Sequence, residues 1–410
     1  MIIIILATYI LLEATNYIKY CVQYAKLNNF IDNKNIDHEK ICIGASTITL
    51  DTLNHIKNIT NQFMDLFFHN TNIDKISYEN ALSEITHSLY YPINTKHINN
   101  IHTKHIINKI ESINSIKLNV TNTIQSKNNN LITWYTPLPI IILKYILAYI
   151  SRKNLKKLGF TKITLENKIN LWIRSSNLSN NAIIFFHASL GGLLVYNDFF
   201  KNLSLDKTII LPEIPGVAYG NDLFIPPTIY EISRCVTEHI KNNNYKKIDL
   251  IGHSFGCNFV SCIINRFPEI NIDKTIIIEG FVFLPRISYI YKFFNDNGLY
   301  GLIKAIKYKN YGELLSIPFF YRDLYLQFYM KRCIKASENI LLGNTSYENN
   351  SKNIYVIFSK NDSKIFVDEV INYIKSKKYN YNIKVFENKK HGDFAFCENM
   401  QKYVLNILKN

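Results

Sequence analysis

The hydrophobic pattern divides the chain into two parts with different rhythms. From residue 160 onward, short apolar or alternating runs of strand length are separated by longer segments with helical spacing. The predicted strands are FTKITLE, KINLWIR, NAIIFFH, KTIILPEIPG, KKIDLIG, DKTIIIEG, NIYVIFSKND and NIKVFEN. The predicted helices cover about 226–243, 255–267, 364–377 and 395–409. Strands that alternate with helices in this way indicate an α/β fold, with a mostly parallel sheet and helices on both faces.

The first 150 residues have a helical and partly polar character. The chain begins MIIIILATYILL, and Glu13 is the first charged residue. No basic segment precedes this run and no small-residue cleavage site follows it, so it does not have the form of a secretory signal. Twelve residues are too few to span a bilayer. We therefore expect a longer helix that either contacts a membrane or is buried, followed by helices and loops over residues 28–130.

A second apolar segment covers residues 131–150, and Lys144 is its one charged residue. Trp134 and Tyr135 lie near its start, and a basic cluster follows its end at Arg152, Lys153, Lys156 and Lys157. This order is typical of a membrane segment whose basic end faces the cytosol. However, a lysine at the bilayer centre costs about 2.5–3.5 kcal/mol. Membrane association, spanning or interfacial, and a purely buried helix both remain open.

The net charge and the cysteine content indicate which kinds of partner and which cellular compartment suit the chain. The chain has 410 residues and a net charge of +15, and residues 151–410 hold 35 basic residues against 22 acidic ones. No nucleic-acid-binding motif accompanies this charge, so an anionic lipid surface is a better match than a nucleic acid. The seven cysteines contain no CxxC pair, and we expect reduced thiols in a cytosolic setting.

The candidate chemistry begins at the sequence GHSFG, residues 252–256. It lies where the strand KKIDLI ends and the next helix begins, which is the context of the GxSxG nucleophile elbow. Gly252 and Gly256 supply the missing side chains that such a tight turn requires. The turn would present the hydroxyl of Ser254 at a helix N-terminus, where a developing negative charge is favoured.

With this motif in this context, residues 160–410 resemble the α/β-hydrolase superfamily. The resemblance implies a serine nucleophile, an acid and a histidine in that chain order. Asp362 follows a late apolar strand and matches the acid, while Glu279, at the end of DKTIIIEG, is the alternative acid. His391 follows the last strand in the segment KKHGDF and matches the histidine. The catalytic residues implied are therefore Ser254, Asp362 and His391.

The resemblance also implies an oxyanion hole made of two backbone N–H groups. Phe255, the residue after the nucleophile, is expected to supply one of them. The loop after NAIIFFH is expected to supply the other, with Ser189 as the first choice and Ala188 or Leu190 as alternatives. Most relatives have His-Gly at the start of this loop, whereas this chain has His187-Ala188.

We expect a helical N-terminal region over residues 1–150 and a hydrolase domain over 151–410, with a helical cap at about 281–350. Residues 281–329 contain 15 Phe or Tyr residues, which suit either an acyl-chain pocket or an aromatic core. The predicted function is hydrolysis of carboxylic esters, of lipid type, at a membrane surface or in the cytoplasm, without metal or organic cofactor. The alternatives are an acyltransferase or thioesterase that uses the same residues, and an inactive binding protein.

Overall fold

The computed structural model of the chain describes most of the sequence from residue 133 onward and several earlier segments. The described residues are 2–29, 78–79, 81, 101–114, 118, 131, 133–189, 191–220, 225–283, 323–334, 339, 341 and 353–409. Most of the region 28–130 and of the predicted cap at 281–350 lies outside these residues. The expected domain division at residue 150 falls inside a helix, and it stays a prediction.

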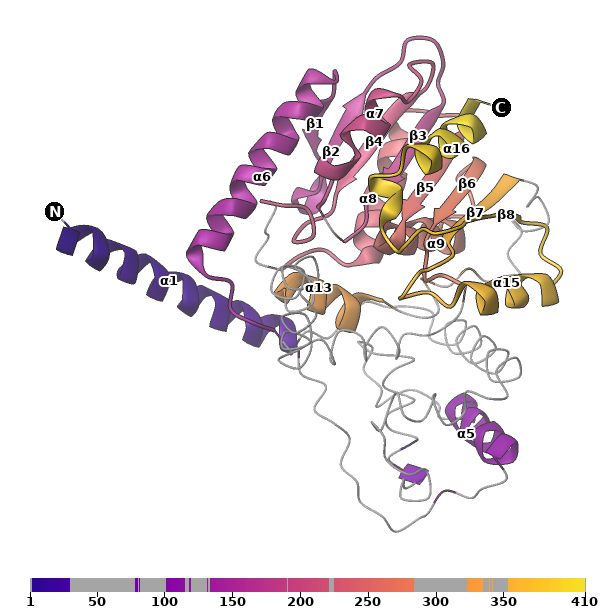
Figure 1. Ribbon diagram of the computed structural model, residues 1–410, viewed down its shortest axis with the longest axis horizontal. Helices are drawn as coiled ribbons and strands as arrows, with labels where there is room; N and C mark the ends of the chain where they lie inside the picture. Colours follow the sequence, from indigo (N-terminus) through magenta and orange to yellow (C-terminus); the bar gives the residue numbers. More distant parts are fainter. Residues whose placement is uncertain are drawn as a thin grey trace.

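An eight-stranded sheet forms the centre of the molecule (Figure 1). Its strands are β1 (Thr161–Thr164), β2 (Asn170–Arg174), β3 (Ala182–Phe186), β4 (Thr208–Glu213), β5 (Ile248–His253), β6 (Ile272–Ile278), β7 (Ile354–Ser359) and β8 (Asn382–Phe386). They lie in the order β1-β2-β4-β3-β5-β6-β7-β8. The pairs β1/β2 and β2/β4 are antiparallel, and all other neighbouring pairs are parallel.

Alternation along the strands supplies two separate hydrophobic cores, one on each face of the sheet. In β3, Ile184 and Phe186 point into one core, and Ile183 and Phe185 point into the other. The first core is covered by α8 (Ile229–Asn242), α9 (Cys257–Arg266) and α15 (Val367–Ser376), and the second by α7 (Asn197–Lys201) and α16 (Glu398–Lys409). Strands with both faces buried are apolar throughout, which explains the continuous runs in the sequence.

A local sequence signal explains the start of α8. Thr228 precedes α8 and accepts a hydrogen bond from the backbone N–H of Glu231, while the Glu231 carboxylate accepts one from the backbone N–H of Thr228. This reciprocal pair is a capping box. The four predicted helices start two or three residues before α8, α9, α15 and α16, because each prediction included loop residues that precede the first helical turn.

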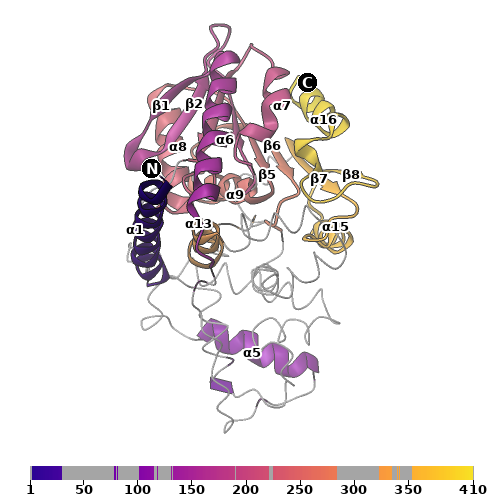
Figure 2. The same cartoon turned by 60° about the vertical axis from the view of Figure 1, so that its left-hand side comes forward.

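The N-terminal region is helical where it is described, with α1 (Ile2–Asn28), α5 (Ile101–Asn114) and α6 (Leu138–Lys157). Figure 1 shows α1 extending away from the body and α6 running beside β1 and β2. Figure 2, which brings that side forward, shows that α1 and α6 lie on the same side of the molecule. The alternative of a fully buried helix is wrong for both segments, because α1 and α6 each expose several large apolar side chains.

The one charged residue of the second apolar segment, Lys144, points toward the protein. Its ammonium group lies 2.8 Å from a carboxylate oxygen of Asp323, which precedes the short helix α13 (Leu324–Phe328). The cost of burying this lysine is therefore offset by an ion pair. Among the residues that the structure describes, no helix is both long enough and apolar enough to cross a membrane.

The prediction of a mostly parallel α/β sheet with helices on both faces and a helical N-terminal region is confirmed. The parallel strands β3, β5, β6, β7 and β8 bring their carboxyl ends to one edge of the sheet. Ligands of open α/β sheets bind at this edge.

Candidate active site

The turn after β5 places Ser254 at the carboxyl edge of the sheet. Ser254 opens a short 3-10 turn, η5 (Ser254–Gly256), that leads directly into α9. Its φ of 51° lies in the left-handed region, which is unusual for a residue with a side chain. A Cβ at position 252 would lie 2.7 Å from the Cα of Cys257, and one at position 256 would overlap the carbonyl group of Phe186 in β3. Glycine is therefore required on both sides of the serine.

A continuous hydrogen-bonded chain links Ser254 to two residues that follow the last strands. The hydroxyl of Ser254 lies 2.8 Å from Nε2 of His391, which follows β8. Nδ1 of the same ring lies 2.7 Å from Oδ2 of Asp362, which follows β7. The structure thus brings the three predicted side chains into contact, in the geometry of a nucleophile, a base and an orienting acid.

Two backbone groups fix the carboxylate of Asp362. Its Oδ1 accepts hydrogen bonds from the N–H groups of Lys364, at 2.7 Å, and Ile365, at 2.9 Å. The side chain of Asp362 is fully buried. Because Oδ1 is held by the turn, Oδ2 is directed at the imidazole of His391. The same aspartate therefore serves as the turn residue before α15 and as the partner of the histidine.

The environment of His391 favours a neutral imidazole. Burial lowers the pKa of His391, and the positive charge of Lys364 lowers it further, while the carboxylates of Asp362 and Glu279 raise it. The net result is a pKa below the usual value for histidine. A neutral ring can accept the proton of Ser254, so this direction suits a general base.

The alternative acid, Glu279, occupies a different position. It follows β6 with a φ of 51° and is completely buried. Its Oε2 lies 2.9 Å from Nε2 of His253 and accepts a 2.6 Å hydrogen bond from the N–H of Gly392, and its Oε1 accepts one from the hydroxyl of Ser359. Burial opposes its ionisation, but the hydrogen bonds that it accepts from His253 and Ser359 hold the pKa of Glu279 down to about 2. Glu279 therefore hydrogen-bonds to the backbone N–H of Gly392, next to His391, whereas the imidazole ring of His391 is hydrogen-bonded to Asp362.

A second buried chain of side chains extends from Glu279 toward the loop after β3. The hydroxyl of Tyr196 lies 2.6 Å from Nδ1 of His253 and accepts a 3.2 Å hydrogen bond from the N–H of Ala188. In the consistent assignment, Tyr196 donates its proton to Nδ1 of His253, and Nε2–H of His253 donates to Glu279. This chain joins the loop before Ser189 to the loop that carries His391. Sequence reasoning missed Tyr196 and Ser359, because neither belongs to a recognisable motif.

The predicted oxyanion-hole residues lie around the same point. Phe255 follows Ser254 directly in η5, and Ser189 lies in the loop after β3. The N–H of Ala188 is engaged by Tyr196, so Ala188 is not available as an alternative donor. Leu190, the other alternative, lies outside the described residues. The roles of Phe255 and Ser189 stay predictions.

His187 anchors this loop to the neighbouring strand. Its Nδ1 contacts the carbonyl oxygen of Ala188 at 2.7 Å, and its Nε2 accepts a 3.2 Å hydrogen bond from the N–H of Ile214, just after β4. Burial lowers the pKa of His187 to about 4. The side chain is therefore neutral at neutral pH and acts as a fixed connection between two loops. The His187-Ala188 segment, where most relatives have His-Gly, is thus fixed in position by hydrogen bonds to Ile214 and Tyr196.

One cluster among the described residues has a geometry that could hold a metal ion, formed by Glu166, Cys235 and Glu238. The guanidinium group of Arg234 lies 2.6 Å from Glu238 and 3.5 Å from Glu166. Burial also raises the pKa of the Cys235 thiol. A cation already neutralises the carboxylates and the thiol is disfavoured as a thiolate, so the donor set does not suit a metal.

Several solved structures are similar to this chain. A carboxylesterase from Bacillus subtilis has 14% sequence identity and a TM-score of 0.45, and the match covers 65% of this chain and 98% of that one. An α/β hydrolase from a deep-sea metagenome library of the Medee basin has 11% identity and a TM-score of 0.47, with 61% and 98% covered. A membrane phospholipase A has 11% identity and a TM-score of 0.46, with 66% and 93% covered.

No protein-family model matches this sequence, and no curated protein matches it either. At identities this low, the fold assignment rests on the strand order and on the turn at Ser254. The mostly parallel sheet, flanked by helices and with the GxSxG turn after β5, is the arrangement that the resemblance in sequence implied, and the structure adds the strand order β1-β2-β4-β3-β5-β6-β7-β8. The chain has an α/β-hydrolase fold.

Proposed function

We propose that the protein is a serine hydrolase that cleaves carboxylic esters through Ser254, His391 and Asp362. The observation that carries the proposal is the chain of two hydrogen bonds, of 2.8 and 2.7 Å, that joins these three side chains at the carboxyl edge of the sheet. A serine hydroxyl is a weak nucleophile, and a neutral imidazole within hydrogen-bonding distance is the group that activates it.

The proposed reaction proceeds in two halves. In the first, the Ser254 oxygen attacks the acyl carbonyl carbon while His391 takes the hydroxyl proton, and the resulting oxyanion binds to the N–H groups of Phe255 and Ser189. His391 then donates this proton to the departing alcohol, which leaves an acyl-enzyme on Ser254. In the second half, water attacks the acyl-enzyme with His391 as base, and the acid product is released.

Asp362 acts on the imidazole in both halves. It holds the Nδ1–H tautomer of His391, so that Nε2 is free to accept the serine proton, and it stabilises the imidazolium that forms. The two backbone hydrogen bonds to Oδ1 of Asp362 support this role, because they orient the carboxylate before substrate arrives. Such preorganisation lowers the cost of reaching the transition state.

The proposed substrates are lipid-like esters, and the proposed place of action is a membrane surface that faces the cytosol. The apolar side chains that α1 and α6 expose support the membrane. The cysteines support the cytosol, because none of the six in the described part of the chain forms a disulfide: Cys21, Cys235, Cys257, Cys262, Cys333 and Cys397.

Ester hydrolysis is tested with p-nitrophenyl esters of increasing acyl length, using the full chain beside Ser254→Ala. The proposal expects hydrolysis by the wild type, with a preference for the longer acyl chains, and none by the variant. Adding an alcohol or a thioester substrate distinguishes hydrolysis from the alternatives of acyl transfer and thioesterase activity. Wild-type protein that is folded and inactive on every ester would contradict the proposal.

A further inference from the structure

Over residues 138–150, helix α6 exposes large apolar side chains and turns its one charged residue, Lys144, toward the protein, the reverse of a helix on a water-exposed surface. Six large apolar side chains of α6 are exposed to solvent: Ile142, Leu143, Tyr145, Ile146, Tyr149 and Ile150. They recur at the spacing of one helix face and form a continuous stripe. An exposed apolar patch of this size marks an interaction surface.

The opposite face of α6 carries its polar and charged contacts with the protein. Lys144 pairs with Asp323 at 2.8 Å, and Arg152 lies 3.3 Å from Glu213. Ala148 is buried so closely against the chain that a Cβ on Gly220 would lie 2.7 Å from its own Cβ. This face of α6 is therefore covered by the hydrolase domain, and the apolar stripe is directed away from it except at Tyr145, whose ring lies near Gly220.

Helix α1 has the same inverted arrangement. The polar side chains that attach it to the body recur every three or four residues and are Glu13, Asn16, Tyr20 and Gln23. Glu13 accepts a 3.1 Å hydrogen bond from the N–H of Leu138, the first residue of α6, and Gln23 donates a 2.8 Å hydrogen bond to the hydroxyl of Tyr325. These contacts place α1 beside α6.

The outer surface of α1 is apolar over most of its described length. Its exposed large side chains are Leu6, Tyr9, Ile10, Leu11 and Leu12 in the first half, and Tyr17, Ile18 and Val22 in the second. The hydroxyl of Thr15, on the same outer surface, donates a 2.8 Å hydrogen bond to the carbonyl of Leu11, so it needs no water partner. In Figure 1 the first half of α1, which carries five of these exposed side chains, extends away from the body.

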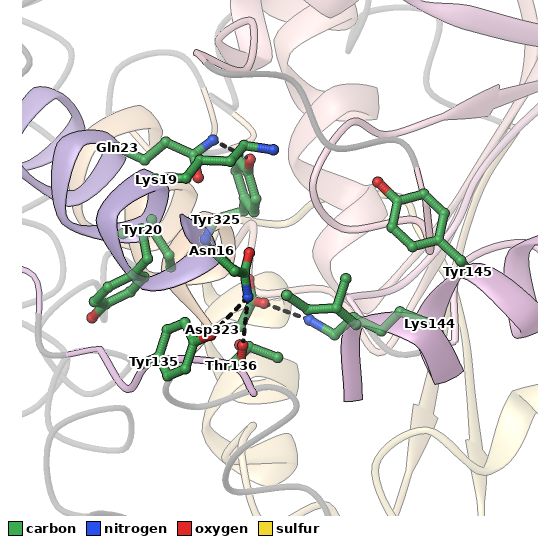
Figure 3. Close-up of a pocket in the computed structure, with 12 residues that line it drawn as sticks. Asn16, Lys19, Tyr20, Gln23, Tyr135, Thr136, Lys144, Tyr145, Asp323 and Tyr325 are labelled. Atoms are coloured by element: carbon green, nitrogen blue, oxygen red, sulfur yellow. Dashed lines mark hydrogen bonds and ion pairs between the residues drawn. The ribbon is translucent and has the colours of Figure 1, made fainter. Parts of the chain in front are cut away.

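The polar groups of the two helices meet in a small crevice between α1, α6 and α13, with a volume of about 90 Å³ (Figure 3). Asn16 and Gln23 enter it from α1, Lys144 from α6, and Asp323 and Tyr325 from α13 and its cap. Both helices therefore turn several polar side chains toward this crevice, while most of their exposed large apolar side chains, Tyr145 apart, lie on the outer faces. The pairing of polar groups inside the protein leaves an outer surface suited to hydrocarbon.

We propose that the exposed apolar faces of α1 and α6 form one docking surface for an anionic lipid bilayer. Its basic border consists of Lys153, Lys156 and Lys157, which are exposed in the last turns of α6, directly after the apolar stripe. A bilayer offers hydrocarbon next to anionic headgroups, which matches this order of apolar and basic residues. A second copy of this chain, with a net charge of +15, would bring like charges together.

The orientation follows from the covered face of α6. Because the hydrolase domain covers one side of α6, the helix lies along the interface with its apolar stripe toward the acyl chains and its last turns at the headgroups. The inference rests on the proposed function in one respect: docking would bring the enzyme to lipid-like esters. The evidence for docking itself comes from the exposed side chains of α1 and α6.

Vesicle co-sedimentation of the full chain tests the surface. The probes are vesicles of phosphatidylcholine alone or mixed with phosphatidylserine. The test variant is Ile146→Gln/Ile150→Gln, and the matched control is Leu178→Gln/Leu205→Gln, at two exposed leucines in loops of the hydrolase domain. We expect the test variant to bind about tenfold more weakly or worse, because apolar area is lost, and the control to bind like the wild type.

The basic border has its own variant, Lys153→Gln/Lys156→Gln/Lys157→Gln. We expect it to lose about fivefold in affinity per lysine on the anionic vesicles, and little on neutral ones. Wild-type protein that fails to bind anionic vesicles, or a test variant that binds like its control, would overturn the proposal. So would a dimer in sedimentation velocity that dissociates in the isoleucine variant while vesicle binding is absent.

The docking and the catalytic proposals fail in different ways. Ser254→Ala should bind vesicles like the wild type, because Ser254 lies in the turn after β5 and not on either helix. The isoleucine variant should react with an active-site probe in solution like the wild type. Loss of vesicle binding with intact probe reactivity therefore concerns the docking surface alone.

Discussion

Glu279 provides a sharp test, because it is the alternative acid and its carboxylate accepts a hydrogen bond from the backbone next to His391. In the variant Glu279→Gln, the amide oxygen can keep the hydrogen bonds from His253 and Gly392. The amide nitrogen then faces the hydroxyl of Ser359, which can rotate to accept it. The substitution therefore retains the hydrogen bonds and removes the charge.

The size of the effect follows from the pKa of Glu279, which is lowered from 4.5 to about 2 in the folded protein. A lowered pKa means that folding favours the ionised carboxylate, here by about 3 kcal/mol for this fully buried group. This stability is present above about pH 4.5 and is lost as the pH falls through about 2. We expect Glu279→Gln to lower the free energy of unfolding by about 3 kcal/mol at pH 7, and the difference from the wild type to vanish toward pH 2.

Urea unfolding followed by tryptophan fluorescence measures this difference, because Trp172 is buried in β2. The matched control is Asp249→Asn. Asp249 is equally buried, in β5, but burial raises its pKa even though Lys207 lies 2.7 Å away. Folding therefore does not favour its charge, and the control should lose less stability at pH 7. Equal losses in the two variants, or a Glu279 difference that persists at pH 2, would refute the reasoning.

The same variant separates the structural acid from the catalytic one. Because Gln at 279 still accepts the hydrogen bond from Gly392, His391 keeps its position. We expect Glu279→Gln to react with a fluorophosphonate probe within about one order of magnitude of the wild type. A folded Glu279→Gln protein without reactivity, beside a reactive Asp362→Asn, would show that Glu279 is the catalytic acid.

Asp362→Asn should lower kcat by about 10⁴ with little change in secondary structure, because the amide favours the wrong tautomer of His391; ester hydrolysis and circular dichroism test this, and a loss below tenfold would contradict it. The acid limb of the pH profile of kcat/KM should lie below about pH 6.5, because the base must be neutral and burial lowers the pKa of His391; a limb above that value would contradict the assignment of the base. Gly256→Ala should prevent folding of the elbow, since the new Cβ overlaps the carbonyl group of Phe186, and expression with full probe reactivity would refute this.

The positions of the strands along the chain and of the elbow followed from the sequence, because both depend on local patterns, whereas the order of the strands in the sheet came from the structure. Buried parallel strands such as β3 and β5 are continuous apolar runs, and two glycines around Ser254 indicate a turn where side chains cannot fit. Asp362 and His391 could be chosen because the resemblance implies an acid and a histidine after late strands, and each of them follows such a strand.

Other features depend on contacts that no local pattern contains. Tyr196 joins His253 through the fold, across 57 positions of the sequence. Glu279 and Asp362 both follow an apolar strand, and only the packed structure shows which carboxylate bonds to the ring of His391.

The two apolar segments were ambiguous for a related reason. Their sequences show which residues are apolar but not which side the protein covers. In the sequence, the charge of Lys144 counts against contact with lipid. In the structure, Lys144 forms an ion pair with Asp323 and lies on the face of α6 that the protein covers.

The most direct test of the central claim is fluorophosphonate labelling of the purified full chain, with wild type beside Ser254→Ala and His391→Ala. The account predicts that the wild type is labelled at Ser254, and that both variants lose the label while they keep their fold. Folded wild-type protein that remains unlabelled, or labelling that persists in Ser254→Ala, would contradict the claim that Ser254 is an activated nucleophile.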